Sequence, residues 1–172
     1  AGGLPAYYLA VWNGLTWSQV GGGLNGPALA LAVEGTKLYV GGSFTRAGSR
    51  TVSNLAIYDI NTGQWSGPSQ PMDGAVNALQ LDGAGNLYVG GSFRNIGALA
   101  ARRVARYNLS NGSWSAMGNG FNGEVRALAY GGGSLYAGGN FTQSGSRTLN
   151  YLAAWNAVNS RWEAIGQGVS DA

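Results

Sequence analysis

The sequence predicts an all-β chain that folds as a β-propeller, and three observations support this prediction. Tryptophans recur at Trp17, Trp65, Trp114 and Trp162, with spacings of 48, 49 and 48 residues. The stretch "LYVGGSF" at 38–44 returns at 87–93, and again as "LYAGGNF" at 135–141. The 31 glycines of the 172 residues fall between short apolar runs and indicate many turns. A repeat of this length with four short strands is typical of a propeller blade.

Each repeat contains four expected strands in the same order. The first lies at 28–33, 76–81 and 125–130, and the second is the "LYVGGSF" stretch. A polar loop leads to the third strand at 54–59, 103–108 and 151–156, and the fourth begins at the repeat tryptophan. The first two strands are apolar with little alternation, so we expect both to be buried on both faces. The chain then divides into a half blade at 1–26 and blades at 27–74, 75–123 and 124–172.

The repeat is out of phase with the ends of the sequence. Residues 1–12 align without gaps to residues 47–58, so the chain starts with the outer half of a blade. It ends with "GVSDA" at 168–172, where another first strand is expected. Because an unpaired inner edge is costly and three and a half blades cannot close a ring, we expect one of two situations. The chain is a piece of a longer protein, or a protomer that completes its ring or stack with neighbours.

A glycine doublet, then an aromatic residue, six residues and a tryptophan recur in every full repeat and resemble the kelch motif. The copies are Gly41-Gly42 with Tyr58 and Trp65, Gly90-Gly91 with Tyr107 and Trp114, and Gly138-Gly139 with Trp155 and Trp162. The spelling "LYVGGSFTRAG…NLAIYD…W" is similar to the secreted repeats of bacterial surface proteins and of the Rax2-like cell-polarity marker family. The resemblance implies an extracellular or cell-surface propeller, and it says little about function because propellers serve many functions.

Composition excludes several classes of site. The chain has no cysteine and no histidine, which removes thiolate sites and the commonest general base and metal ligand. Its net charge is only +3, and the one tight basic cluster is Arg102, Arg103 and Arg106. Alternation in a strand would point these three side chains in different directions, so we expect no nucleic-acid partner. No apolar run approaches the ~20 residues that span a bilayer, so we expect no membrane insertion of this segment.

We predict no catalytic residues, no cofactor and no metal site. The acidic residues form no close pair on one face of a strand, as a glycosidase would need. Asp59 and Asp82 stand at turns, and the turn 82–86 ("DGAGN") is only weakly suggestive of calcium. Galactose oxidase shares the kelch-type fold, but its copper centre depends on His and Cys, which this chain lacks. The glycine doublets are expected to shape the backbone and the repeated aromatic pairs to pack between blades.

The loop between the second and third strands is the best candidate for a binding site, because long loops tend to carry function. Four arginines fall in it, Arg46, Arg50, Arg94 and Arg147, and "GSRT" recurs at 48–51 and 145–148. These arginines would either bind a carboxylate or glycan, or donate to the carbonyls of a neighbouring blade. Tyr7, Tyr8 and Tyr151 break the repeat near the third strand and are expected to be exposed.

Three asparagines stand in Asn-x-Ser/Thr sequons: Asn108, Asn111 and Asn140. Asn108 and Asn111 flank an expected exposed turn, where a glycan is tolerated, and a sequon has meaning only in a eukaryotic source. The predicted function is a non-catalytic structural or interaction propeller, with protein partners, self-assembly or glycan contacts. One alternative is a carbohydrate-binding lectin, and another is the scaffold part of an enzyme whose catalytic residues lie outside this chain.

Overall fold

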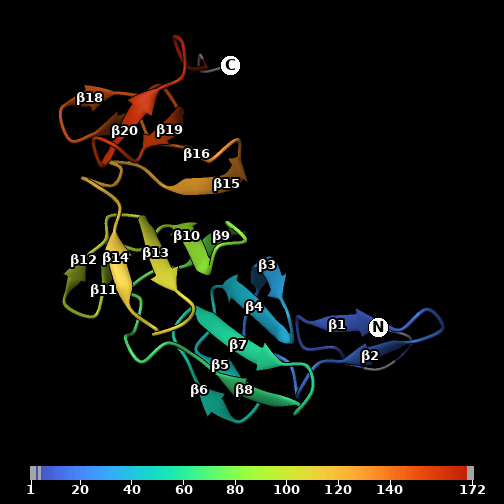
Figure 1. The fold of residues 1–172 in the computed structure, drawn as a ribbon. Helices are drawn as coiled ribbons and strands as arrows, with labels where there is room; N and C mark the ends of the chain where they lie inside the picture. Colours follow the sequence, from blue (N-terminus) through green and yellow to red (C-terminus); the bar gives the residue numbers. More distant parts are fainter. Residues whose placement is uncertain (1–2, 4, 170–172) are drawn as a thin grey trace.

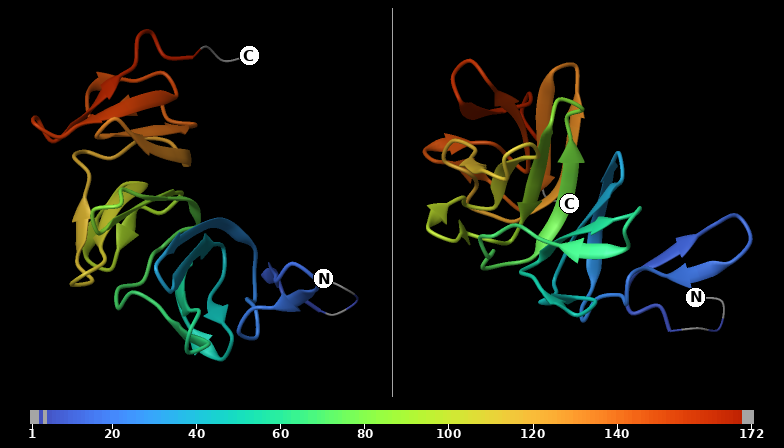
Figure 2. Two further views of the ribbon diagram at one scale, coloured as in Figure 1. Left: turned by 45° about the vertical axis from the view of Figure 1, so that its right-hand side comes forward. Right: turned by 60° about the horizontal axis from the view of Figure 1, so that its bottom comes forward.

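The computed structural model of the chain describes residue 3 and residues 5–169. These residues form three four-stranded antiparallel sheets and four two-stranded ones, arranged along an arc (Figure 1). The N-terminal hairpin lies at one end of the arc and the last sheet at the other, which the further views in Figure 2 also show. None of the described residues form a helix long and apolar enough to cross a membrane. The further first strand expected from 168–172 falls largely on residues 170–172, which lie outside the described residues.

The three four-stranded sheets are the three predicted blades. The first blade contains β3 (Ala28–Glu34), β4 (Lys37–Gly42), β7 (Leu55–Asp59) and β8 (Gln64–Ser66). The second contains β9 (Val76–Leu81), β10 (Asn86–Gly91), β13 (Val104–Asn108) and β14 (Trp114–Ala116). The third contains β15 (Val125–Gly131), β16 (Ser134–Gly139), β19 (Leu152–Asn156) and β20 (Arg161–Ala164). Within each sheet, strands that follow one another in this order are hydrogen-bonded neighbours.

Four shorter hairpins complete the fold. The half blade consists of β1 (Ala10–Trp12) and β2 (Trp17–Gln19), which correspond to the two outer strands of a blade. The other three stand between the second and third strand of each blade: β5 (Arg46–Ala47) with β6 (Arg50–Thr51), β11 (Asn95–Ile96) with β12 (Leu99–Ala100), and β17 (Gln143–Ser144) with β18 (Arg147–Thr148). We refer to these three as the rim hairpins, because in Figure 1 each lies on the side of the arc away from β3, β9 and β15.

The glycine doublets permit close contact between neighbouring blades. A Cβ placed on Gly90 of the second blade would lie 2.5 Å from Cγ1 of Val125 in the third. Gly41 faces Val76 across the preceding interface in the same way. The second glycine of each doublet lies against a carbonyl of its own blade and pairs with the start of the first strand, where the register shifts. The doublets therefore shape the backbone, as predicted.

Each of the three cores joins residues from two neighbouring units of the repeat. The core between the second and third blades, for example, contains Tyr88 and Val104 from one blade and Leu135 and Trp162 from the other. The aromatics after the doublets, Phe44, Phe93 and Phe141, are all buried. Since the cores lie between blades, the stability of one blade depends on its neighbour, as in other repeat proteins.

The expected burial of the first two strands is only partly correct. β4 and β10 are largely buried, but β3 exposes Leu29, Leu31 and Val33, each more than half accessible. Their side of β3 faces the half blade, where no other described residues form inner strands beside β1 and β2. β15 is also mostly exposed. Apolar composition therefore predicted which strands are inner strands, while burial depends on the presence of both neighbours.

We predict that a methyl group is tolerated in the glycine doublets only where no blade packs against it. Gly90→Ala should lower the free energy of unfolding by about 1–3 kcal/mol, because the new Cβ overlaps Val125. Gly138→Ala is the matched control, since the nearest atom to its added Cβ, the carbonyl oxygen of Tyr151, is 3.9 Å away. Urea unfolding followed by tryptophan fluorescence measures both. Equal destabilisation of the two variants would contradict the close-approach role of Gly90.

Candidate functional site

Of the four arginines that the sequence singled out, three lie on rim-hairpin strands and the fourth directly precedes one. Arg46 pairs with Thr51 across the first hairpin, and Arg50 pairs with Ala47. Arg147 occupies in the third hairpin the place that Arg50 has in the first, because it pairs with Ser144. Arg94 immediately precedes β11 in the second hairpin. The structure therefore distributes these arginines over successive blades along one rim and does not gather them into a single pocket.

Each rim hairpin is held at its base by one side chain from the linker that precedes the blade. The carboxamide oxygen of Asn25 accepts hydrogen bonds from the backbone N–H groups of Thr45 and Arg46, at 2.9 and 2.8 Å. Asp73 and Asn122 do the same in the next two blades, where they bind the N–H groups of Arg94, Asn95, Thr142 and Gln143 at 2.7–2.9 Å. We call Asn25, Asp73 and Asn122 the linker clamps.

The linker clamps were not predicted, although the sequence contains a signal for them. An Asn-Gly or Asp-Gly pair stands at 25–26, 73–74 and 122–123, with the spacing of the repeat. The glycine of each pair lies against backbone atoms after the second strand, for example Phe93 in the case of Gly74, and leaves no room for a Cβ. The pair therefore combines a hydrogen-bonding side chain with a close approach of two backbones.

In the first strand of each rim hairpin, one residue is exposed and the next is buried. Ala47, Ile96 and Ser144 point inward and are buried. Bridges from Leu24 to Ala47 and from Met72 to Ile96 add backbone contact with the linkers. Alternation thus turns Arg46 to solvent, while Arg50 and Arg147 are exposed although they pair with the buried Ala47 and Ser144.

All four arginines are exposed, and none makes a salt bridge or a side-chain hydrogen bond in the part of the chain that the structure describes. The alternative in which they donate to carbonyls of a neighbouring blade is therefore not observed for them. Arg103 makes a similar contact within its own unit: its Nη1 donates to the carbonyl oxygen of Phe121, near the end of the same blade, at 2.7 Å. In the sequence Arg103 stands out only as part of a basic cluster, and this contact was not predicted.

Arg103 is one of four equivalent residues with a left-handed backbone before the third strand. Tyr8, Asn54, Arg103 and Tyr151 have φ values of 68°, 65°, 76° and 68°. Tyr7 and Tyr8 are exposed as predicted, but Tyr151 is only half-exposed. A left-handed residue other than glycine is uncommon, and its recurrence here shows that the backbone turn belongs to the repeat.

The two rings of each repeated aromatic pair contact each other within one blade. The ring centroids of Tyr58 and Trp65 are 4.8 Å apart, and the pairs Tyr107–Trp114 and Trp155–Trp162 are similar at 4.7 and 5.3 Å. The indole Nε1 of Trp65 donates to the carbonyl of Gly21 at 2.7 Å, and that of Trp162 to the carbonyl of Met117 at 3.1 Å. Both acceptors lie on the linker from the preceding unit, so these tryptophans connect neighbouring units, in agreement with the predicted packing role.

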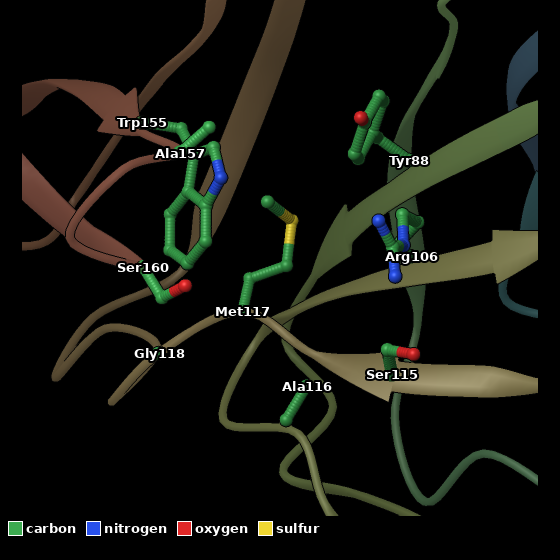
Figure 3. Close-up of a pocket in the computed structure, with 9 residues that line it drawn as sticks. All are labelled: Tyr88, Arg106, Ser115, Ala116, Met117, Gly118, Trp155, Ala157 and Ser160. Carbon is green, nitrogen blue, oxygen red and sulfur yellow. The ribbon is translucent and has the colours of Figure 1, made fainter. Parts of the chain in front are cut away.

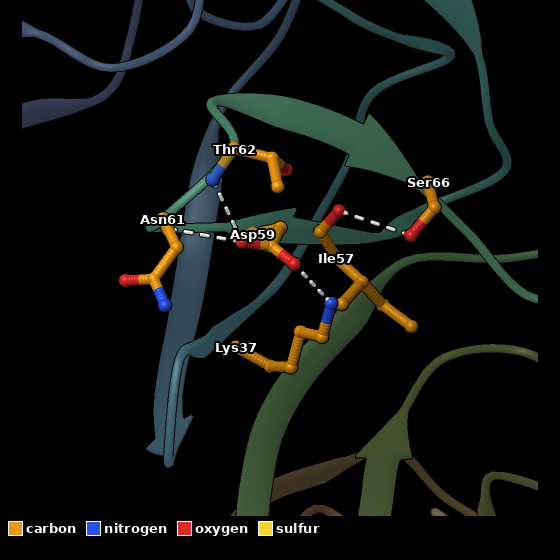
Figure 4. A network of polar contacts seen from close by, with 6 residues as sticks. All are labelled: Lys37, Ile57, Asp59, Asn61, Thr62 and Ser66. Atoms are coloured by element: carbon orange, nitrogen blue, oxygen red, sulfur yellow. Dashed lines mark hydrogen bonds and ion pairs between the residues drawn. The ribbon is translucent and has the colours of Figure 1, made fainter.

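The carboxylates that were considered for catalysis or calcium accept hydrogen bonds within the turns in which they stand. Asp59 accepts the N–H groups of Asn61 and Thr62 and forms a salt bridge with Lys37 (Figure 4). The bond from Lys37 and the turn N–H groups lower the pKa of Asp59 to about 2. Asp82 accepts hydrogen bonds from Ala84 and from the backbone and side chain of Asn86. Among the described residues, no three acidic side chains come together as a metal site.

The three sequon asparagines occupy different environments. Asn108 is half-buried, and its side-chain oxygen accepts bonds from Ser110 and Asn111 within the turn after β13. Asn111 is exposed at the tip of that turn, and Asn140 is exposed after β16. Accessibility therefore favours Asn111 and Asn140 as positions where a glycan fits.

The chain is similar to known proteins in family and in fold. Residues 21–86 and 81–170 match the family described as the Rax2 C-terminal beta propeller domain. The computationally designed Ika4 protein shares the fold at a TM-score of 0.57 and 17% identity, over 86% of this chain and 76% of Ika4. The designed Ika8 protein gives a TM-score of 0.59 at 17% identity, over 95% of this chain and 44% of Ika8. No curated protein sequence matches the chain significantly.

The linker clamp of the second blade should make the stability of the protein depend on acid pH. Burial opposes ionisation of Asp73, but the N–H groups of Asn95 and Arg94 outweigh it, so its pKa is lower than usual. This stabilisation is present above the ordinary aspartate pKa of about 3.9 and is lost as pH falls through the lower folded value. Asp73→Asn should therefore show a smaller loss of stability between about pH 5 and about pH 2.5.

The other two clamps supply the control, because asparagine already holds the same geometry there. Asn122→Asp should increase the acid sensitivity that Asp73→Asn reduces, since a carboxylate would then face the N–H groups of Thr142 and Gln143. Urea unfolding at a series of pH values measures both variants. An unchanged pH profile in both would show that the clamp carboxylate is not coupled to folding.

Proposed function

We propose a function from the premise that the chain belongs to the family of Rax2 C-terminal beta propeller domains. On this premise it is a structural and interaction propeller, and we place it in a secreted or cell-surface protein, without catalytic activity of its own. Its rim hairpins contact a protein or glycan that carries negative charge. The surface location rests on the family resemblance and on the sequons, of which Asn111 and Asn140 are accessible.

The observation that carries this proposal is the state of the rim arginines. Arg46, Arg50, Arg94 and Arg147 are exposed, and each stands on a hairpin whose backbone is fixed by a linker clamp. None has an acidic partner within salt-bridge distance in the described chain, whereas Lys37, Arg126 and Arg161 each have one. Beyond that distance, the charge of Arg147 contributes to lowering the pKa of Glu163, after hydrogen bonds from Asn156 and Arg161. A guanidinium that is positioned and unpaired is well suited to bind a carboxylate or sulfate of a partner.

A binding function accounts for the carboxylates better than catalysis does. A hydrolase would need a positioned acid and base with shifted pKa values in a cleft. Here the pKa values of Asp59, Asp73 and Asp82 are all lowered by hydrogen bonds that hold turns and linkers. These carboxylates stay ionised, and their oxygens already accept hydrogen bonds, so they are unsuitable as general acids. An enzyme that uses this chain as a scaffold stays an alternative, with its catalytic residues on another segment.

The lectin alternative is the specific form of this function in which the partner is a glycan. We expect Arg50→Ala combined with Arg147→Ala to weaken binding to acidic glycans on an array by at least about tenfold, because two charge-assisted contacts are removed. The control is Arg126→Ala combined with Arg161→Ala, which removes the same charge from two arginines that already have acidic partners.

Comparison of the two variants distinguishes binding at the rim hairpins from a general effect of the net charge of the protein. Loss of glycan binding in the rim variant alone supports the rim hairpins as the contact surface. Equal loss in both variants would reduce the effect to net charge, and unchanged binding in both would overturn the proposed role of the rim arginines.

A further inference from the structure

A pocket of about 290 Å³ opens between the second and third blades. Its walls include Tyr88, Arg106 and Ser115 from the second blade, Met117 from the linker, and Trp155 and Ser160 from the third blade. Figure 3 shows Trp155 and Arg106 on opposite sides of this pocket, with the side chain of Met117 between them. We call it the interblade pocket, and it is separate from the rim hairpins.

Strand register places one wall of the pocket on a single face of the second blade. Tyr88 pairs with Arg106 and Arg106 pairs with Ser115, so the three side chains stand in a row across β10, β13 and β14. Tyr88 stacks on Tyr130 of the third blade, with ring centroids 6.1 Å apart. The row therefore faces the third blade, and Arg106 stands at the opening between the two blades.

The repeat shows that this pocket is not a general feature of the fold. At the interface between the first and second blades, Ile57 has the place of Arg106, because it pairs with Tyr39 as Arg106 pairs with Tyr88. On the opposite wall Leu109 has the place of Ala157, since each follows the last asparagine of its strand. Ile57 and Leu109 both pack on the core of that interface.

Two of the substitutions that distinguish the second interface from the first change both charge and space. Arginine in place of isoleucine brings a cation to one wall, and alanine in place of leucine removes an apolar side chain from the other. Packed interiors normally leave few such spaces. The interblade pocket contains a cation where the interface of the first and second blades is apolar and filled. This gives it the chemistry of a ligand site.

The guanidinium of Arg106 is available to a ligand. It is exposed and has no salt bridge or hydrogen bond within the described part of the chain. The neighbouring carboxylate, Asp82, is held by its own turn and also accepts the hydroxyl of Tyr88 at 3.4 Å. The remaining polar groups on the walls are the hydroxyls of Ser115 and Ser160, and the indole of Trp155 supplies an apolar surface opposite the cation.

We propose that the interblade pocket binds a sugar ring that carries a carboxylate, such as a hexuronic acid. The fork of Arg106 accepts the carboxylate, as guanidinium groups do in bidentate pairs. The apolar face of the sugar ring lies toward the indole of Trp155. The ring hydroxyls lie on the side of the hydroxyls of Ser115 and Ser160. The volume is at the low end of ligand pockets, so it suits one ring and not a long oligosaccharide.

Nuclear magnetic resonance titration of the whole chain with glucuronate tests the site. We expect glucuronate to shift the indole N–H signal of Trp155, while glucose has no comparable effect because it lacks the carboxylate. Arg106→Ala should weaken glucuronate binding at least about tenfold. Arg126→Ala is the matched control, because it removes an exposed arginine that lies outside both the interblade pocket and the rim hairpins.

A second variant tests the pocket without relying on charge alone. Arg106→Ile with Ala157→Leu introduces the residues of the first interface at these two positions, so it should abolish glucuronate binding and keep or raise the thermal midpoint of unfolding. Glucuronate binding that survives Arg106→Ala, or glucose binding of equal strength, would overturn the proposal. Benzoate that binds as well as glucuronate would overturn the sugar as the ligand. Since Arg50 and Arg147 are not involved, failure here leaves the role of the rim hairpins to its own test.

Discussion

The close contact between a glycine of one blade and a valine of the next is the constraint on which the structure depends. Gly41 against Val76 and Gly90 against Val125 bring neighbouring sheets together at the inner strands, where no side chain fits between them. Once that contact is made, the aromatic residues after each doublet and the large residues of the linkers fill the core between the blades. The contact uses backbone shape, so it recurs unchanged while other positions of the repeat differ.

This constraint also explains why sequence predicted the architecture well and burial less well. The doublets and tryptophans identify the strands and their order because each marks a step that every blade must repeat. The exposure of Leu31 on β3 could not be predicted, because its counterpart Leu79 packs near Gly41 and the two have the same local sequence pattern. The burial of a propeller strand depends on the neighbouring blade. The local sequence pattern of the strand contains no information about that neighbour.

The candidate sites were partly predictable for a similar reason. The rim arginines were recognised because they stand in the longest loop, but the side chains that hold this loop come from linkers about 20 residues earlier. The contact of Trp162 with Met117 and the position of Arg106 opposite Trp155 also cross from one unit to the next. Contacts of this kind between units follow from the curvature of the arc. The sequence of one repeat does not show which residues of the next unit lie opposite it.

Variation in this chain is concentrated at positions that the blade contact does not use. The linker clamps hold the rim hairpins through backbone N–H groups, so the equivalent hairpin position is free to be Arg50, Leu99 or Arg147 without a change in backbone. At the interfaces, the glycine–valine contact keeps two blades together even where Ile57 is replaced by Arg106. Because backbone geometry maintains the arc in both cases, surface and pocket chemistry can differ from blade to blade, and this separation is what allows a repeated fold to carry distinct binding sites.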